Sequence, residues 1–234
     1  MATQFKLELD TRPPLIPYRE TITGKAEGHC RHKKQSGGAG QFGEVYLKIE
    51  PLERGAGFEF VDHVKGGVIP GVFMPAVEKG VRQALAGGVT AGFPVEDLRV
   101  IVYDGKTHPV DGKEVAFVTA GRKATVEAIR AASPIVLEPI VNIEIVSPEA
   151  YIGDLTGDLS SRRGHITGTN PRPGGTAAIT GEVPLAEVTD YASRLKSMTG
   201  GQGAYSIEFV RYAQVPPQVQ HKLAASFQLK DEDE

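Results

Sequence analysis

The chain has 234 residues, a length that suits two domains of ordinary size. Its apolar content of 40% allows a buried core, and its net charge of −3 means that any nucleic-acid contact must come from local basic patches. The single cysteine, Cys30, excludes an internal disulfide and fits a reducing cytoplasm. No apolar run approaches the roughly 20 residues that a membrane helix needs.

Strand patterns dominate the beginning of the chain. Alternating polar and apolar residues predict strands over 4–9 and 44–51, and the segments 18–22 and 25–31 also look extended. Segments 25–31 and 44–51 are expected to pair as a β-hairpin, because a Gly-rich loop over 33–43 separates them.

Two helical patterns follow, with strands before and between them. A short strand is predicted over 58–61, and apolar residues at helical spacing predict a helix over 74–85. The apolar run 98–103 suits a buried strand, which a turn at Asp104-Gly105 is expected to end. The longest helical pattern covers 114–132, where Ser133-Pro134 closes it.

The second half of the chain has the order β-α-β-β-α-β. This order predicts a ferredoxin-like sandwich, with two helices on one face of an antiparallel sheet. A domain boundary is expected near 135–139, and the charged end, 230–234, is expected to be a disordered tail. The predicted strands are 140–146, 165–169, 176–183 and 205–212, and the predicted helices are 151–163 and 185–198.

The glycine-rich segment 38–45 fits the pattern G-x-G-x-x-G-x-V, which some nucleotide-binding proteins contain. A dinucleotide site needs a helix after this loop, whereas a strand is predicted here. A kinase glycine loop has strands on both sides, but the H-R-D and D-F-G motifs are absent from the sequence. Two interpretations remain open. The segment is either a flexible hairpin loop or a loop whose backbone lies against a ligand, with Lys33 and Lys34 beside it to meet phosphate.

A second segment resembles part of a phosphate-binding loop. Gly105-Lys106-Thr107 matches the end of a Walker A motif, but Val100 occupies the position where that motif requires glycine. We therefore expect an ordinary turn at this point. Without a phosphate-binding loop, the chain is not expected to act as a GTPase by itself.

The cluster His29, Cys30 and His32 contains residue types that bind metals. Strand alternation places His29 on one face and the other two residues on the opposite face. Two ligands on one face do not make a tetrahedral zinc site, and no second Cys/His pair follows. We therefore predict no metal site and leave the role of these residues open.

Arg162 and Arg163 close the first predicted helix of the second domain. Cations at a helix C-terminus interact favourably with the helix dipole, by about 0.3–1 kcal/mol. This structural role and a contact with RNA remain equally open. No paired carboxylates and no nucleophile–base set stand out, so no catalytic residue is predicted.

Five segments, in the same order, resemble bacterial elongation factor G. Residues 35–43 (QSGGAGQFG) resemble its Q-S-G-G-x-G-Q-[YF]-G loop, and residues 103–111 (YDGKTHPVD) resemble its Y-D-G-x-x-H-x-V-D loop. Residues 136–140 (VLEPI) resemble L-L-E-P-I. Residues 153–164 resemble G-D-V-I-G-D-L-x-x-R-R-G, and residues 183–187 (VPLAE) resemble V-P-L-A-E. The resemblance extends almost from end to end.

The resemblance implies an α+β fold in two domains. Residues 1–137 are similar to the family's fourth domain, which has the fold of the second domain of ribosomal protein S5. Residues 138–226 are similar to the ferredoxin-like fifth domain, and 227–234 form the charged tail. The GTPase domain and the next two domains would be absent, so we expect a fragment of a longer protein. GTP and magnesium would bind in the missing domain, and no cofactor is expected in this chain.

In the family, two loops of the fourth domain reach the decoding centre and contact the codon–anticodon duplex. A glycine loop can approach the shallow minor groove of RNA closely and donate backbone N–H groups to it. The residues that match these loops are Ser36, Gly37, Gly38, Gly40, Gln41, Phe42 and His108. Four cations are candidate contacts to ribosomal RNA: Lys33, Lys34, Arg162 and Arg163.

The function implied is GTP-dependent translocation of tRNA and mRNA by a cytoplasmic, monomeric factor. Its partners would be the ribosome, ribosomal RNA and the tRNA–mRNA duplex, with no membrane contact. Ala39 stands where family members often carry arginine, and Gly112-Lys113 replaces a common Ser-Ser pair. These departures leave open a paralogue, or a relative that acts in ribosome recycling or rescue. A ribosomal protection factor of the tetracycline-resistance kind shares this architecture, but the intact Ser-Gly-Gly…Gln loop argues against it. A nucleotide-binding enzyme that uses 38–43 is the alternative from another class.

Overall fold

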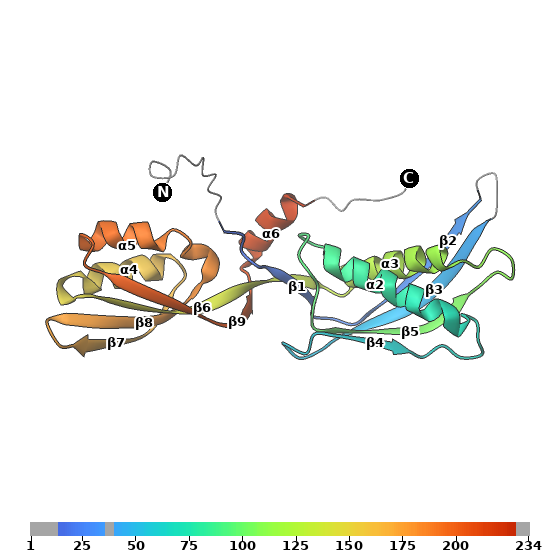
Figure 1. The fold of residues 1–234 in the computed structure, drawn as a ribbon, viewed down its shortest axis with the longest axis horizontal. Helices are drawn as coiled ribbons and strands as arrows, with labels where there is room; N and C mark the ends of the chain where they lie inside the picture. Colours follow the sequence, from blue (N-terminus) through green and yellow to red (C-terminus); the bar gives the residue numbers. More distant parts are fainter. Residues whose placement is uncertain (1–13, 36–39, 228–234) are drawn as a thin grey trace, which may run out of the picture. The chain divides into compact units, whose positions relative to one another are not determined.

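The computed structural model describes residues 14–35 and 40–227 (Figure 1). These residues divide into two compact units. The first domain contains 18–137 and 214–227, and the second contains 14–17 and 138–213. The predicted strand over 4–9 and the charged end over 230–234 lie outside the described residues. Within the described part of the chain, no helix is long and apolar enough to cross a membrane.

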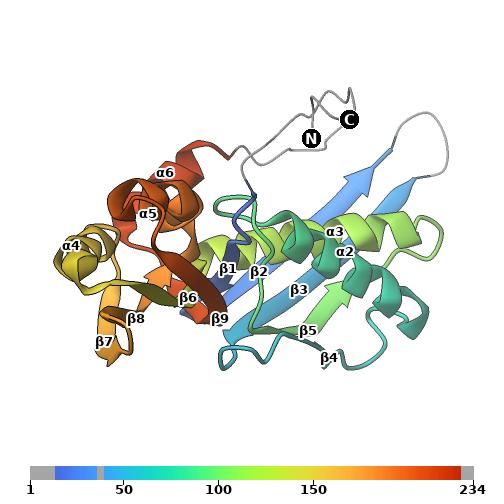
Figure 2. The same cartoon turned by 60° about the vertical axis from the view of Figure 1, so that its left-hand side comes forward.

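The first domain is a four-stranded sheet with two helices on one face (Figures 1 and 2). The strands lie in the order β2 (Ala26–Lys34), β3 (Gln41–Pro51), β5 (Leu98–Lys106) and β4 (Phe58–Asp62). β3 is antiparallel to both β2 and β5, while β4 is parallel to β5. The helices are α2 (Met74–Gly87), after the short turn η1 (Gly71–Phe73), and α3 (Glu114–Ala131). The predicted β2–β3 hairpin and both predicted helices are thus confirmed.

Small residues allow α3 to lie close against this sheet. A Cβ at Gly28 of β2 would lie 2.0 Å from the carbonyl oxygen of Ala124, a separation that no side chain tolerates. The face of α3 that contacts the sheet is rich in alanine around the fully buried Phe117. Val45, Leu47 and Ile49 alternate along β3 and are fully buried, as the period of two predicts. Among the described residues, no helix packs on the opposite face of the sheet.

The second domain confirms the ferredoxin-like prediction. Its strands lie in the order β9 (Ala204–Gln214), β6 (Pro134–Pro148), β8 (Thr176–Pro184) and β7 (His165–Arg172). The helices α4 (Ile152–Ser161) and α5 (Tyr191–Thr199) pack on one face around a core that includes Ile143, Ile145, Leu155, Leu159 and Ile179. The first residues of β6 lie in the first domain, where they pair with β1 (Arg19–Ile22).

Two predicted boundaries differ from the structure. β5 continues through Asp104 and Gly105, because Gly105 pairs with Val45 and a Cβ there would lie 2.4 Å from the carbonyl oxygen of Glu44. The predicted turn at these residues is therefore wrong. The predicted helix over 185–198 is divided into η3 (Leu185–Glu187) and α5, since Val188 leaves helical geometry with φ −122° and ψ 15°. Likewise the helix predicted over 151–163 comprises the end of η2 (Glu149–Tyr151) and α4.

The C-terminal helix α6 (Pro217–Ala225) belongs to the first domain, although the predicted second domain extended to residue 226. The backbone N–H of Val215 donates to the Val136 carbonyl at 3.0 Å, and the Gln220 side chain accepts from the Val136 N–H at 3.1 Å. Val215 is buried in a small cluster with Val136 and Ala91. Hydrogen bonds and apolar packing therefore hold α6 on the first domain.

Candidate functional site

Two loops of the first domain meet at one end of its sheet. The backbone N–H of Phe42 donates to the Asp111 carbonyl at 2.7 Å, and Phe42 forms a parallel bridge with Gly112. The rings of Phe42 and His108 lie 6.2 Å apart between centroids. The structure thus brings together the predicted site residues Gly40, Gln41, Phe42 and His108, and we call residues 40–42 and 107–112 the tip. The predicted Ser36, Gly37 and Gly38 lie outside the described residues.

Gly40 lets the two loops of the tip approach one another. A Cβ at this position would lie 2.7 Å from the carboxyl carbon of Asp111, much closer than real Cβ contacts. Gly40 therefore matters for the packing of one loop on the other, in addition to any contact with a ligand.

The imidazole of His108 is oriented by its own loop. Its Nδ1 accepts hydrogen bonds from the backbone N–H groups of Val110 at 3.3 Å and Asp111 at 3.1 Å. In the neutral ring, a nitrogen that accepts carries no proton, so the proton lies on Nε2. The carboxylate of Asp111 is 3.5 Å from the same Nδ1. Half of the His108 side chain is exposed, and the tip therefore presents an N–H donor to a ligand.

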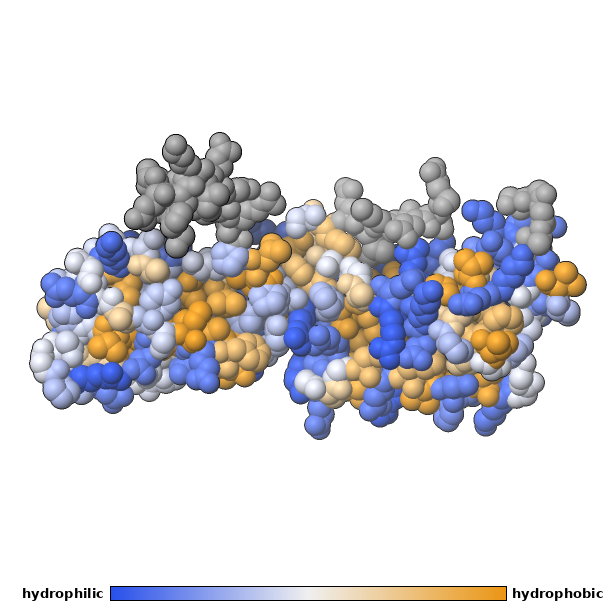
Figure 3. Space-filling model, viewed as in Figure 1, coloured by the Kyte–Doolittle hydropathy of each residue, from blue (hydrophilic) through white to orange (hydrophobic). Residues whose placement is uncertain are grey.

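Hydrophilic residues predominate near the end of the β2–β3 hairpin, with a few hydrophobic ones among them (Figure 3). Lys33 and Lys34 are exposed at the end of β2, as a contact with phosphate would require. Val110, which sequence reasoning missed, is 79% exposed beside His108. An apolar residue inside an otherwise polar loop was the feature of the sequence that could have indicated it.

A buried carboxylate, Glu44, organises the sheet surface next to the tip. It accepts hydrogen bonds from His29 Nε2 at 2.9 Å and from the Tyr46 hydroxyl at 3.2 Å, and it pairs with Arg31 at 3.0 Å. The rings of His29 and Tyr46 stack with centroids 4.0 Å apart. We call these four residues the Glu44 cluster. Sequence reasoning missed it, because its members are ordinary strand residues until the register of the sheet is known.

The remaining members of the His/Cys group point elsewhere. Cys30 packs against the core of the first domain, and His32 lies 3.4 Å from the Gln41 side chain. In 14–35 and 40–227, no group of three or more His, Cys, Asp or Glu side chains could hold a metal ion.

The carboxylate of Glu44 should make the stability of the first domain depend on pH. Burial alone would raise the pKa of Glu44, but hydrogen bonds from Arg31 and His29 and the charge of Arg31 outweigh it, so the pKa lies below the ordinary 4.5. A carboxyl whose folded pKa is lowered stabilises the fold above its unfolded pKa, and this contribution is lost as the pH falls through the folded value. Glu44→Gln should therefore lower stability at neutral pH by about 1–3 kcal/mol. It should also flatten the loss of stability below pH 4.5.

Urea unfolding of the chain at a series of pH values measures this effect. Glu53→Gln is the matched control, because Glu53 is exposed. If Glu44→Gln and the control have the same pH dependence as the parent, the cluster contributes nothing through the ionisation of Glu44.

Arg162 and Arg163 are occupied within the second domain. Arg162 donates to Asp158 at 3.0 Å and to the Glu187 carbonyl at 2.6 Å. Arg163 makes a bidentate pair with Glu138, at 2.6 and 2.9 Å, and the Glu138 side chain is only 3% exposed. The hydrogen bonds to Glu138 raise the pKa of Arg163 above its ordinary value. These contacts favour the structural interpretation over a contact with RNA.

Replacing Arg163 should therefore destabilise the second domain. Arg163→Ala leaves a buried carboxylate without its main partner, and we expect a loss of about 1–3 kcal/mol, since the arginine itself is partly exposed. Arg163 has a φ of +61°, a left-handed conformation that is strained for a residue with a Cβ. Arg163→Gly should therefore cost less than Arg163→Ala, by about 1 kcal/mol. Urea unfolding measures both variants.

The control for this series is Arg172→Ala. Arg172 pairs with Glu144 at the surface, and surface ion pairs contribute about 0–1 kcal/mol. A variant Arg163→Ala that keeps full stability but binds ribosomes more weakly would contradict the structural role.

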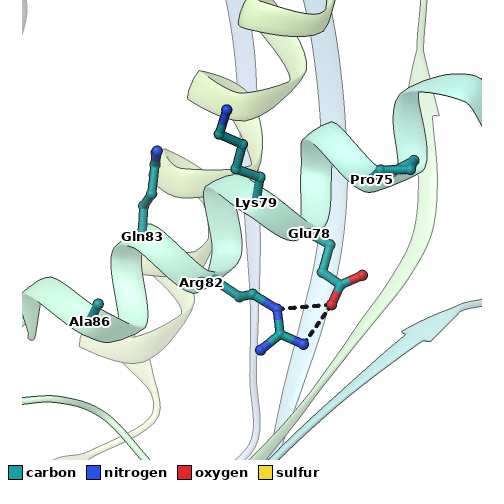
Figure 4. Close-up of a pocket in the computed structure, with 6 residues that line it drawn as sticks. All are labelled: Pro75, Glu78, Lys79, Arg82, Gln83 and Ala86. Carbon is teal, nitrogen blue, oxygen red and sulfur yellow. Dashed lines mark hydrogen bonds and ion pairs between the residues drawn. The ribbon is translucent and has the colours of Figure 1, made fainter.

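A shallow depression lies on the solvent-exposed side of α2 (Figure 4). The side chain of Arg82 points across the depression. It donates hydrogen bonds of 2.9 and 2.7 Å to Glu78, which hold it in place. All of its lining residues come from this one helix, so it lacks the convergent polar groups of a ligand site. The lining residues are Pro75, Glu78, Lys79, Arg82, Gln83 and Ala86.

Comparisons with known proteins cover nearly the whole chain. The family model described as elongation factor G, domain IV, matches residues 14–133, and the model described as elongation factor G C-terminus matches residues 135–223. An elongation factor G-like protein of Thermotoga maritima is 47% identical over 219 residues, which are 94% of this chain and 32% of the relative.

A solved structure is also similar. A crystal structure of a protein from Thermus thermophilus superposes with a TM-score of 0.80 at 40% identity, over 95% of this chain and 33% of that one. The chain therefore spans about a third of the length of the proteins that it matches.

Proposed function

This chain belongs to the elongation factor G family, and on that basis we propose that it is the ribosome-binding C-terminal part of a translational GTPase. The parent protein promotes GTP-dependent translocation of tRNA and mRNA. The observation that carries the proposal is the tip, where Gly40, Gln41 and Phe42 of one family loop pack against the loop that contains His108. The partners are the ribosome, its RNA and the tRNA–mRNA duplex.

The chemistry of the tip suits RNA of any sequence. The minor groove of an RNA duplex is wide and shallow and displays 2′-hydroxyl groups, which accept and donate hydrogen bonds. The Nε2 donor of His108 and the amide of Gln41 suit such groups. Lys33 and Lys34 suit the phosphates on either side. None of these contacts needs to identify a base, which fits a factor that must act on every codon.

GTP and magnesium bind, in this proposal, to the part of the parent that the chain does not include. The sequence contains no complete G-x-x-x-x-G-K-[ST] motif, so this chain itself should not hydrolyse GTP. In this proposal, the chain uses the binding of the parent protein to the ribosome to move the tRNA–mRNA duplex at the decoding site.

A second candidate is ribosome recycling by a paralogue. Two observations favour it: the Thermotoga maritima relative is described as elongation factor G-like, and Gly112-Lys113 departs from the family's common pair at the tip. In that case, the tip would contact the same region of the ribosome during splitting of the subunits.

One experiment separates the two candidates. The full-length parent is added with GTP to ribosomes that hold tRNA in both sites, and movement of the mRNA by one codon is followed by toeprinting. Light scattering reports splitting of the subunits in parallel. Translocation without splitting supports the first candidate, and splitting without translocation supports the second. A parent that does neither and does not bind ribosomes contradicts the whole proposal.

A further inference from the structure

The uncovered face of the first domain's sheet is organised in rows that begin at the tip. Residues that pair across neighbouring strands project from the same face. Lys33 pairs with Phe42, and in the next row Arg31 pairs with Glu44, which in turn pairs with Lys106. The row after that contains His29, Tyr46 and the exposed Asp104, with Tyr103 beside them at the irregularity in β5. The helices α2 and α3 pack on the other face of the sheet (Figure 2).

The first two rows are basic at their surface. Arg31 has a side chain that is 58% exposed, and Lys33 and Lys106 are exposed. The one carboxylate in these rows, Glu44, is 2% exposed and lies beneath its donors. Solvent therefore meets three cationic side chains, and this arrangement complements a polyanion.

Apart from Asp104, whose carboxylate accepts a hydrogen bond from the Gly105 N–H at 2.8 Å, the third row is aromatic and held in place. His29 stacks on Tyr46, and Tyr46 lies 6.4 Å from Tyr103 between ring centroids. Glu44 accepts a hydrogen bond from both His29 and Tyr46, while the Tyr103 hydroxyl donates to Glu27 at 3.3 Å. His29 remains 42% exposed, and Tyr46 and Tyr103 are half-buried. Aromatic rings fixed in this way lose little conformational entropy when a base stacks on them.

We propose that this face binds a single-stranded segment of RNA that continues from the duplex at the tip. The phosphates lie along Arg31, Lys33 and Lys106, and a base or ribose packs on the aromatic row of His29, Tyr46 and Tyr103. Cations that follow the backbone, together with aromatic side chains that stack bases, are the usual means of binding single strands without a preference for sequence. Glu44 is a positioning residue, because it orients three of these side chains and is itself buried.

The dimensions agree with a short strand. Residues two apart on a β-strand are about 6.6 Å apart, so the row of Lys33 is about 13 Å from the row of His29. A stacked strand advances by about 3.4 Å per nucleotide, and about four nucleotides cover this distance. The inference rests on the proposed function, since the tip must first hold a duplex at the end of the sheet.

Two RNA probes test the face separately from the tip. One is a fluorescein-labelled RNA hairpin with a blunt end, and the other carries a 3′ extension of about eight uridines, which lies within the usual site sizes of about 4–16 nucleotides. Anisotropy titrations at several salt concentrations give the affinity of the 234-residue chain for each probe. The variant of the face is Lys106→Gln combined with Tyr103→Leu. His108→Asn reports on the tip, and Lys79→Gln, on the exposed side of α2, is the matched control.

The wild-type chain should bind the extended hairpin at least fivefold more tightly than the blunt one. The face variant should remove this preference and lower the slope of log K against log salt for the extended probe by about 0.7, the value for one phosphate contact on a single strand. Binding of the blunt hairpin should fall with His108→Asn and remain unchanged with the face variant and with Lys79→Gln. Circular dichroism confirms that each variant is folded.

The outcomes separate the two proposals. A wild-type chain with no preference for the extended hairpin, or a face variant that keeps the preference, overturns the inference about the face. If His108→Asn still weakens both probes in that case, the tip proposal stands. If neither His108→Asn nor the face variant affects either probe, both proposals are wrong.

Discussion

Replacing Glu20 with alanine is expected to destabilise the first domain by about 3–5 kcal/mol, a large part of the stability of an ordinary domain. Glu20 lies on β1 and is fully buried. Its carboxylate accepts four backbone N–H groups of the loop after α2. The donors are Val89 at 2.8 Å, Thr90 at 2.9 Å, Ala91 at 2.7 Å and Phe93 at 3.1 Å.

The size of this effect follows from the four donors. Each buried N–H that loses its acceptor costs about 1–3 kcal/mol, although relaxation of the loop and entry of water will recover part of the sum. The backbone of Glu20 also pairs with this region, because its N–H donates to Pro94 and its carbonyl accepts from Glu96. Loss of the carboxylate should therefore loosen the whole loop that connects α2 to β5, and its effect should exceed the loss of a single side-chain contact.

A graded series tests the explanation. Glu20→Gln keeps one oxygen acceptor but turns an NH₂ group toward donors, so it should still cost about 2–4 kcal/mol. Glu53→Gln, at an exposed position, should remain within about 0.5 kcal/mol of the parent. Urea unfolding followed by circular dichroism gives the values, and the transition of the first domain is the one that should move. This account would be contradicted if the free energy of unfolding of Glu20→Ala lay within about 1 kcal/mol of the parent's. That difference is about fivefold in the ratio of folded to unfolded protein.

The elements with strong periodicity were predictable from the sequence. The helical pattern over 114–132 corresponds to α3, Glu114–Ala131, because its small apolar residues recur at helical spacing where the helix meets the sheet. The division into η3 and α5 was not predictable. Leu185, Val188, Tyr191 and Leu195 keep a helical spacing throughout, so periodicity cannot distinguish a continuous helix from a short turn followed by one.

The features that were missed depend on contacts between distant parts of the chain. Glu20 lies 69–73 residues before the N–H groups that it binds, and nothing near it in the sequence indicates that it is buried. The helix α6 belongs to the first domain because Val215 and Gln220 form hydrogen bonds with Val136, which is about 80 residues away in the sequence. The two interpretations of Arg163 could be separated only after Glu138 was found beside it. Local sequence patterns specify the helices and strands. Which polar groups are buried, and which partners they have, can be known only from the tertiary structure.

Variants of the tip are expected to slow translocation by the full-length parent while leaving its GTP hydrolysis on the ribosome nearly normal. A branched side chain in Gly40→Val would collide with the Asp111 carboxyl, where even a Cβ lies at 2.7 Å. The collision should push the two loops apart. A misplacement of about 1 Å can reduce a rate about 100-fold, so we expect a loss of up to that size. GTP hydrolysis should be spared, because the proposed function assigns it to a different domain of the parent.

His108 allows a finer test, because its two nitrogens have different roles. Nδ1 accepts from Val110 and Asp111 within the loop, while Nε2 carries the proton that a ligand can accept. His108→Ala removes both functions. His108→Asn keeps an acceptor that can bond to the backbone two residues on, as Asn does in turns, but lacks the donor at the position of Nε2.

If the donor contacts RNA, both His108 variants should slow translocation by about tenfold, equivalent to one hydrogen bond of about 1.4 kcal/mol. Both should also unfold within about 0.5 kcal/mol of the parent, with the asparagine variant the nearer of the two, since an exposed loop residue contributes little to stability. A rate that recovers in His108→Asn would mean that the loop conformation matters and the donor does not. Parent-like translocation by Gly40→Val and His108→Ala, with normal folding, would show that the tip does not act on the tRNA–mRNA duplex. The same variants would then be measured in subunit splitting, where a recycling factor should lose activity by a comparable factor.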